Sequence, residues 1–191
     1  MSSYPRQRRD FPQFATYDIM FSIRAAGWTM PKLLRPDQVV GSIYEIDLTE
    51  LRERGIRGVI ADLDNTLVPW NGSLVDERLQ EWLRNLREAG LELAIVSNNF
   101  PARVEQVSSR LGVLAVARAV KPRRRAFLSL AGRLGLAPCQ VCVIGDQLFT
   151  DIMGGKRSGM HTVLVTPIDK REFFGTKIMR LLERVLLRTM N

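Results

Sequence analysis

A regular alternation of short apolar runs and amphipathic segments between residues 58 and 165 limits the fold of this chain more than any other feature. The apolar runs are four to six residues long, which suits buried strands, and apolar residues recur between them at helical spacing. The expected strands are Gly58–Leu63, Leu91–Val96, Val113–Ala117, Val141–Ile144 and Thr162–Val165. Strands that alternate with helices predict an α/β fold, with a parallel sheet of about five strands and helices on both faces.

The expected helices begin and end at residues that commonly bound a helix. Gly55 and Gly90 each follow an expected helix, and Pro101 opens another. The expected helices are Leu48–Arg54, Leu74–Glu88, Pro101–Leu111, Pro122–Leu134 and Phe149–Arg157. Residues 33–47 are expected to be irregular, with a short extended piece. The predicted division is an N-terminal tail and apolar, basic helical segment over residues 1–47, a domain over 48–175 and a basic amphipathic helix over 176–191.

The charge of the chain is positive overall but unevenly distributed. Of 191 residues, 28 are Lys or Arg and 20 are Asp or Glu, which gives a net charge of +8. Residues 61–100 contain three basic and seven acidic side chains, whereas residues 101–140 contain eight basic and one acidic. A basic surface attracts phosphate on nucleic acids, lipid headgroups or small molecules. The acidic segment therefore needs a specific explanation.

Composition also disfavours several classes of protein. No apolar run reaches the roughly 18 residues of a membrane span, and Asp10, Pro12 and Asp18 interrupt any secretory signal. The two cysteines cannot form a disulfide framework, so we expect a reducing, cytoplasmic location. The Arg-rich first ten residues leave organelle targeting open.

Polar side chains follow four of the expected strands, at the point where each apolar run ends. Because the carboxyl ends of parallel strands lie at one edge of a sheet, where ligands bind in this fold class, we expect one site there. Its residues are Asp62, Asp64 and Thr66 after the first strand, Ser97 and Asn98 after the second, Lys121 after the third, and Asp146 and Asp151 after the fourth. Asp, Asn and Ser also cap helices, but capping explains neither Lys121 nor the shared edge.

These residue types fit phosphoryl transfer. Carboxylates this close repel one another unless a cation or a proton lies between them, and Mg²⁺ prefers carboxylate and phosphate oxygens as ligands. One carboxylate can attack phosphorus, and a second can move the proton of the leaving alkoxide. A hydroxyl and an ammonium group can hold the transferring phosphoryl oxygens.

The same residues resemble the four motifs of the haloacid dehalogenase (HAD) superfamily of phosphatases. Residues 62–66, Asp-Leu-Asp-Asn-Thr, match the first motif, and Ser97, Lys121 and the segment Gly145–Asp151 match the other three in order. Each motif alone is short, but their order and their positions at strand ends make the resemblance specific. It implies a Rossmann-like fold and a Mg²⁺-dependent phosphomonoesterase.

The resemblance also implies a role for each residue. Asp62 would be the nucleophile that forms an aspartyl-phosphate, and Asp64 would be the general acid and base, which favours a phosphatase over a dehalogenase. The other implied roles are phosphate binding by Thr66, Ser97, Asn98 and Lys121, and Mg²⁺ binding by Asp62, Asp146 and the backbone carbonyl of Asp64, with Asp151 in support.

A longer stretch, residues 33–70, resembles the YqeG-type branch of the superfamily, which is related to phosphatidylglycerophosphate phosphatases of mitochondria and plastids. The spacings from Asn65 to Val96 and from Asn98 to Val120 leave no room for a cap domain, so the site would be open to a bulky or surface-bound substrate. The resemblance, the open site and the basic chain ends together imply an anionic phospholipid substrate. We expect phosphatidylglycerophosphate to be converted to phosphatidylglycerol at a membrane surface.

Two segments near the chain ends could provide peripheral contact with the inner face of an anionic membrane. The expected last helix has a basic stripe beside an apolar face, and the N-terminal segment contains large apolar residues; either can instead pack on the sheet. The residues concerned are Lys177, Arg180, Arg184 and Arg188 in the last helix and Phe21, Trp28 and Met30 in the N-terminal segment.

Other candidate residues have simpler explanations. Cys139 and Cys142 have the spacing of a metal or redox pair but lack a second pair, so we expect a structural role. His161 is expected to have a packing role. The run 123–125 of three arginines is either plain surface or a collar that attracts anions. Nucleic-acid binding is disfavoured, because no aromatic residues are interleaved with these arginines.

Two other functions stay open at this point. One is a soluble HAD phosphatase for a small metabolite or a nucleic-acid terminal phosphate. The other is a non-catalytic binding protein that uses the basic surface, against which the complete set of Asp62, Asp64, Lys121 and Asp146 argues. No sequence feature indicates an obligate protein partner.

Overall fold

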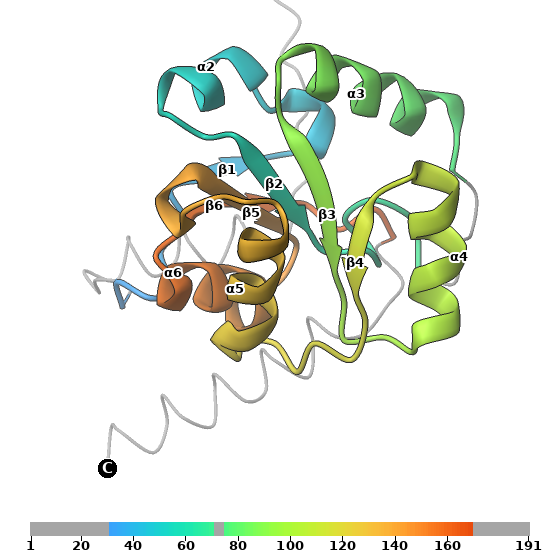
Figure 1. Ribbon diagram of the computed structural model, residues 1–191. Helices are drawn as coiled ribbons and strands as arrows, with labels where there is room; N and C mark the ends of the chain where they lie inside the picture. Colours follow the sequence, from blue (N-terminus) through green and yellow to red (C-terminus); the bar gives the residue numbers. More distant parts are fainter. Residues whose placement is uncertain (1–30, 71–74, 170–191) are drawn as a thin grey trace, which may run out of the picture. The chain divides into compact units, whose positions relative to one another are not determined.

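The computed structural model describes residues 31–70 and 75–169, and it places six parallel strands in one sheet (Figure 1). The strand order is β1-β6-β5-β2-β3-β4. The strands are β1 Gln38–Val40, β2 Gly58–Ala61, β3 Glu92–Val96, β4 Leu114–Val116, β5 Val141–Gly145 and β6 His161–Val165. The expected α/β fold is confirmed, with six strands in place of about five. The expected N-terminal helical segment and last helix lie outside the described residues.

The additional strand is β1, which pairs with β6 so that Gln38 lies opposite Val163. The sequence indicated only a short extended piece here, because three half-buried residues form no continuous apolar run. Asp37 fastens this edge of the sheet: its Oδ2 accepts hydrogen bonds from Thr162 N and Oγ1 at 2.8 and 3.0 Å, and its Oδ1 pairs with Lys156 Nζ. The sheet therefore begins upstream of residue 48.

The order of the strands places β2 at a topological switch point. β2 is paired with β3 on one side and with β5 on the other, and the chain continues from β2 to β3 and β4 before it returns to β5 and β6. The loops that leave the carboxyl ends of β2 and β5 thus diverge. In open parallel sheets, ligands bind at this position.

Helices cover both faces of the sheet (Figure 1). Val59 and Ala61 of β2 belong to a buried cluster with residues of α2, α3 and α4, whereas the intervening Ile60 belongs to a second cluster with residues of α5. The helices are α2 Leu48–Glu53, α3 Glu77–Glu88, α4 Pro101–Leu111, α5 Arg124–Arg133 and α6 Met153–Ser158, with short turns η1 Ile43–Glu45 and η2 Pro138–Gln140. A Cβ at Gly154 would lie 2.4 Å from the Phe127 ring, so the close packing of α6 on α5 requires glycine.

Helices α2 and α5 are one and three residues shorter than predicted, and two other differences have local reasons. Helix α3 begins at Glu77 because Asp76 caps it, with Leu79 N donating to Asp76 Oδ1 at 2.8 Å. The single helix expected over residues 149–157 is divided into a wide π-type turn, η3 Leu148–Ile152, and α6. In the described part of the chain, no additional element lies between β2 and α3 or between β3 and α4.

No helix among residues 31–70 and 75–169 combines the length and the apolar character needed to cross a membrane.

We expect Asp37→Asn to lower the free energy of unfolding by about 1 kcal/mol near pH 7. Hydrogen bonds to charged groups are worth about 1.5–3 kcal/mol, and the value is discounted because the Asp37 side chain is 33% exposed. Burial raises the pKa of Asp37, but hydrogen bonds from Lys156 and Thr162 outweigh it, so the pKa is lower than usual.

The carboxylate of Asp37 therefore stabilises the fold above the pKa of the unfolded chain, and this contribution is lost as the pH falls through the folded pKa. Urea unfolding of the wild type and the variant at neutral pH and at about pH 3 tests this expectation. The difference between the two proteins should shrink at the lower pH. An equal difference at both pH values would contradict a role for the Asp37 charge.

Candidate active site

The residues singled out from the sequence lie at the carboxyl edge of the sheet. β2, β5 and β3 end side by side and are followed by Asp62, Asp146 and Ser97. Asp62 N continues the ladder by donating to Ile144 O at 2.9 Å. Lys121 lies on the loop between β4 and α5. Four separate segments of the chain thus contribute to one edge, as the sequence predicts.

The ammonium group of Lys121 lies between two carboxylates. Its Nζ is 2.6 Å from Asp62 Oδ1 and 2.6 Å from Asp151 Oδ1, and all three residues are buried. Asn98 fixes the Lys121 backbone, because Lys121 N donates to Asn98 Oδ1 at 2.8 Å. Burial lowers the pKa of Lys121, but Asp151 and Asp62 together raise it above its usual value. The lysine therefore stays charged in a buried position.

Asp151 reaches Lys121 because the chain makes the wide turn η3 after β5. Asp151 Oδ2 accepts a hydrogen bond from Gln147 N at 3.2 Å, which fixes the carboxylate beside the end of β5. A Cβ at Gly145 would lie 2.3 Å from the Asp151 carboxyl carbon, so only glycine fits there. The sequence indicated a supporting role for Asp151, and the structure places it in direct contact with Lys121.

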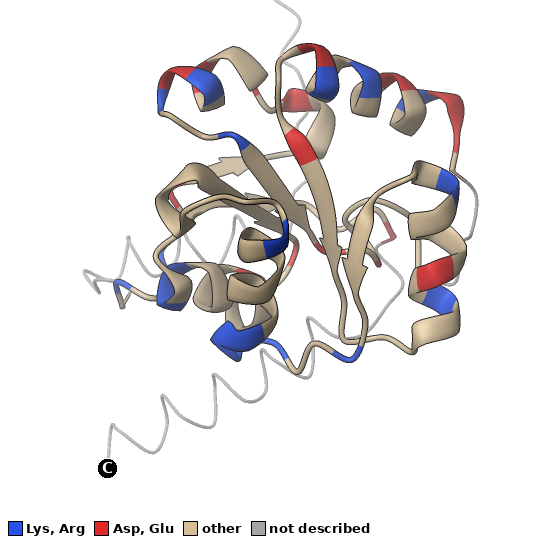
Figure 2. Ribbon diagram, in the orientation of Figure 1, with Lys and Arg blue, Asp and Glu red and all other residues tan. Residues whose placement is uncertain are grey.

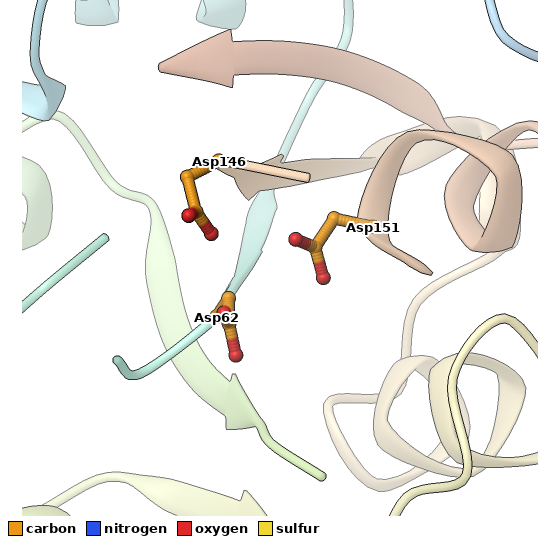
Figure 3. A group of neighbouring side chains, drawn as sticks. All are labelled: Asp62, Asp146 and Asp151. Carbon is orange, nitrogen blue, oxygen red and sulfur yellow. The ribbon is translucent and has the colours of Figure 1, made fainter. Parts of the chain in front are cut away.

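Three carboxylates, from Asp62, Asp146 and Asp151, converge on one small space (Figure 3). One oxygen atom of each lies within 4.8 Å of the other two. Burial raises the pKa of Asp62 to about 7 and raises the pKa of Asp146 well above its usual value. When all three are ionised, Lys121 compensates only one of the three negative charges. A divalent cation would balance the other two, and an all-oxygen set of this kind suits such an ion.

Two residues that the sequence analysis did not single out hold the side chain of Asp64. Arg103 Nη2 lies 3.0 Å from Asp64 Oδ1, and Asn99 Nδ2 donates to Asp64 Oδ2 at 3.0 Å. Arg103 occupies the first turn of α4, where a positive charge opposes the helix dipole. That unfavourable position was the one available signal that Arg103 has a partner elsewhere. The side chain of Asp64 is thus held by the segment that follows β3.

The loop after Asp64 is shaped by Asn65, which adopts a φ of 64°. Asn tolerates this left-handed conformation better than most residues, and its Oδ1 accepts hydrogen bonds from Trp70 N and Asp169 N, both at 3.3 Å. The next residue, Thr66, is buried, and its Oγ1 lies 3.5 Å from Asp146 Oδ1. The loop therefore places Thr66 beside the carboxylate cluster.

Ser97 and Asn98 organise the loop that carries Lys121. Ser97 Oγ accepts a hydrogen bond from Asn99 N at 3.0 Å, and Ser97 O accepts one from Ala119 N at 3.0 Å. Together with the bond from Lys121 N to Asn98, these contacts join the loops that follow β3 and β4. Contacts of Ser97 and Asn98 with a phosphoryl group stay predictions.

Cys139, Cys142 and His161 do not belong to the carboxylate cluster. Cys142 is buried within β5, and burial raises the pKa of its thiol, while Cys139 is exposed. His161 begins β6 at the amino edge of the sheet, where its Nδ1 lies 3.6 Å from Asp37 Oδ2. Burial lowers the pKa of His161.

Comparison with known proteins points to one family. Residues 47–159 match the family model described as haloacid dehalogenase-like hydrolase. The probable phosphatase YqeG of Bacillus subtilis (strain 168) is 40% identical over 158 residues, which cover 83% of this chain and 92% of the relative.

Two relatives from photosynthetic organisms are more distant. Phosphatidylglycerophosphate phosphatase 1 of Arabidopsis thaliana (chloroplastic/mitochondrial) is 26% identical over 163 residues, which cover 80% of this chain and 47% of the relative. The chloroplastic phosphatidylglycerophosphate phosphatase 1 of Chlamydomonas reinhardtii is 30% identical over 165 residues, which cover 81% of this chain and 59% of the relative. The chain therefore spans only about half the length of these two proteins.

We expect Asp146→Asn to stabilise the metal-free protein and to remove its response to divalent metal. The variant lacks one buried negative charge, which should raise the free energy of unfolding by on the order of 1 kcal/mol above neutral pH. Because the pKa of Asp146 is raised in the fold, the wild type loses stability as the pH rises from acid toward the folded pKa, and the variant should lose less.

Thermal unfolding in a chelator and then in Mg²⁺ measures both effects. Mg²⁺ should raise the Tm of the wild type and of the control variant Glu92→Gln, which changes an exposed carboxylate at the amino end of β3. The Tm of the Asp146→Asn variant should change little when Mg²⁺ is added. A variant that is less stable than the wild type in the chelator, or that responds equally to Mg²⁺, would contradict the cluster's role.

Proposed function

The chain belongs to the haloacid dehalogenase-like hydrolases, and from this premise we propose that it is a Mg²⁺-dependent phosphatase acting on an anionic phospholipid of the phosphatidylglycerophosphate type. The phosphatase class follows from the family and from the relatives that match most of the chain. One observation carries the catalytic proposal. The Lys121 ammonium group lies 2.6 Å from both Asp62 and Asp151, beside the carboxylate of Asp146.

Asp62 is the nucleophile of the proposed reaction. One of its carboxylate oxygens forms a bond to phosphorus while the bond from phosphorus to the ester oxygen of the substrate breaks, and Asp64 gives this oxygen a proton. The alcohol leaves, and the protein holds an aspartyl-phosphate on Asp62. Water then attacks phosphorus, Asp64 takes up a proton, and inorganic phosphate leaves as the Asp62 carboxylate is restored.

Charge compensation decides whether Asp62 can act in this way. Without metal, burial holds the pKa of Asp62 at about 7, so part of the protein would carry an uncharged Asp62 at neutral pH. Mg²⁺ held by Asp62, Asp146 and Asp151, with the Asp64 carbonyl as a further ligand, would supply positive charge to the phosphoryl oxygens. Lys121 supplies a fixed positive charge beside the attacking carboxylate.

The phospholipid substrate is supported by two observations. The two phosphatidylglycerophosphate phosphatases resemble most of this chain, and the described residues contain no cap element over the carboxyl edge of the sheet. A cytoplasmic location with peripheral contact to an anionic membrane belongs to the same proposal. Its support is the basic stripe of Lys177, Arg180, Arg184 and Arg188, which lies outside the described residues.

Phosphate release from two substrates tests the proposed function. With Mg²⁺, the wild type should release phosphate from phosphatidylglycerophosphate in mixed micelles much faster than from an aryl phosphate, and Asp62→Asn should release none from either. Equal turnover of both substrates, or turnover of the aryl phosphate alone, would keep the phosphatase and reject the lipid. No Asp62-dependent turnover would favour a non-catalytic protein.

A second expectation concerns Arg103, which we expect to position the general acid. Arg103→Ala should lower kcat by about 10–100-fold, the range expected for impaired proton transfer, with little change in KM. Arg103→Lys should recover only part of the loss, because lysine cannot place both Nε and Nη2 against Asp64 Oδ1, as Arg103 does at 3.3 and 3.0 Å.

A comparison of substrates with different leaving groups distinguishes positioning of Asp64 by Arg103 from a purely structural role of Arg103. An aryl phosphate with an acidic phenol needs little proton donation, so its turnover should fall much less than that of an alkyl phosphate. The exposed Arg110, also on α4, provides the control variant Arg110→Ala. Equal losses for both substrates would mean that Arg103 does not act through Asp64.

A further inference from the structure

The loops that follow β3 and β4, together with the first residues of α5, carry a group of outward-facing apolar and basic side chains beside the active site. We call this group the rim surface; it consists of Phe100, Arg118, Val120, Arg123, Arg124 and Arg125, all exposed. Among the described residues, the two most exposed large hydrophobic side chains are Phe100 at 67% and Val120 at 54%. Neither contributes to the mechanism described above.

Two residues of the rim surface have a backbone conformation that is unfavourable for residues other than glycine. Arg118 has a φ of 46° and Val120 a φ of 55°. A β-branched residue in the left-handed region is a true outlier and costs free energy. The adjacent Ala119 and Lys121 are buried, so this conformation turns Val120 outward while Lys121 enters the site. The exposed Val120 gains little packing in return, and strain of this kind collects at functional positions.

The two loops are joined by backbone hydrogen bonds. Arg118 N donates to Asn99 O at 3.0 Å, and Ala119 N donates to Ser97 O at 3.0 Å. Above this backbone link, the guanidinium of Arg118 lies 5.3 Å from the centroid of the Phe100 ring. Phe100 and Arg118, an apolar and a charged member of the rim surface, are therefore held next to each other.

The charge of this region is strongly one-sided. Residues 117–125 contain five basic side chains and no acidic one. Figure 2 shows this as a segment between β4 and α5 with Lys and Arg but no Asp or Glu. Exposed aromatic and aliphatic side chains close in the chain to several arginines match the interface of an anionic bilayer, where apolar groups enter the acyl boundary and basic groups meet the headgroups. Nucleic acid would need more stacking aromatics than Phe100.

We propose that the rim surface docks on an anionic phospholipid bilayer and holds the carboxyl edge of the sheet against the lipid headgroups. The choice of a bilayer as partner rests in part on the proposed function, because a phospholipid phosphatase must meet its substrate in a membrane. The docking surface lies on the loops that also carry Lys121 and the residues next to Ser97, and on the first residues of α5. Docking would thus bring the headgroup phosphates to Asp62 and Lys121 without lifting the lipid far from the bilayer.

A fluorescent label at position 100 tests where the protein meets the membrane. In the full chain with Phe100→Cys and Cys139→Ser, an environment-sensitive dye at position 100 should shift to the blue and brighten with vesicles of phosphatidylcholine and phosphatidylglycerol. The control is the wild-type chain labelled at its exposed Cys139, just before β5 at the amino edge, where no shift is expected. A shift at position 139 alone, or at neither position although the protein sediments with the vesicles, would overturn the proposal.

Charge reversal provides the second test. Arg123→Glu/Arg124→Glu should weaken binding to these vesicles at least about tenfold, given roughly 1 kcal/mol per basic residue near an anionic membrane. The control Arg84→Glu/Arg157→Glu makes the same change in net charge on α3 and at the end of α6 and should bind like the wild type. Equal weakening in both variants, or loss of single-stranded nucleic-acid binding without loss of vesicle binding, would overturn the proposal.

Two further measurements separate docking by the rim surface from docking by the C-terminal basic stripe and from the proposed substrate. The Arg180→Glu/Arg184→Glu/Arg188→Glu variant reverses three of the four basic residues that the sequence analysis assigned to the C-terminal stripe, and the dye at position 100 should still shift in that background. Turnover of a soluble aryl phosphate should stay unchanged in Arg123→Glu/Arg124→Glu. Vesicle binding through the rim surface without lipid turnover would reject the proposed substrate and keep the docking proposal. Lipid turnover in micelles without a dye shift at position 100 on vesicles would keep the substrate and reject the docking proposal.

Discussion

The ion pairs of one buried ammonium group, that of Lys121, organise the carboxyl edge of this sheet. Lys121 touches Asp62 from β2 and Asp151 from the turn after β5, so it joins segments on both sides of the switch point. Several local features make this contact possible. Gly145 leaves space for the Asp151 carboxylate, and Asn98 fixes the Lys121 backbone. Removing the ammonium group would leave two buried carboxylates without compensation, which is far more costly than losing an exposed ion pair.

Backbone strain collects at the same edge. Among the described residues, three other than glycine have a positive φ, namely Asn65, Arg118 and Val120, and all three lie on loops that carry site residues. The stability that tolerates them comes from the remainder of the fold. Two buried clusters cover the faces of the sheet, and Asp37 fastens the opposite, amino edge. A well-packed sheet thus supports a strained and highly charged carboxyl edge, a common arrangement in proteins that bind ligands on loops.

The sequence predicted those parts of the site that depend on local order. Asp62, Ser97 and Asp146 each follow an apolar run, and the carboxyl ends of parallel strands must meet. It did not predict contacts that depend on packing between distant segments. The pairing of Arg103 with Asp64 joins residues 39 positions apart, and a three-residue strand such as β1 has no periodic pattern of its own. The sequence did not predict the wide turn η3, because the contact that it allows, between Asp151 and Gly145, forms only in the folded structure.

The charges of the site also determine the order in which its ligands can bind. A substrate phosphate is itself an anion, and with Asp62, Asp146 and Asp151 ionised beside a single Lys121 the metal-free cluster repels it. In a buried, weakly screened position this repulsion is not removed by salt. Protonation of Asp62 would relieve the repulsion but would also remove the proposed nucleophile. A divalent cation held by the cluster would relieve it and leave Asp62 ionised, so we expect the cation to bind before the phosphoryl group.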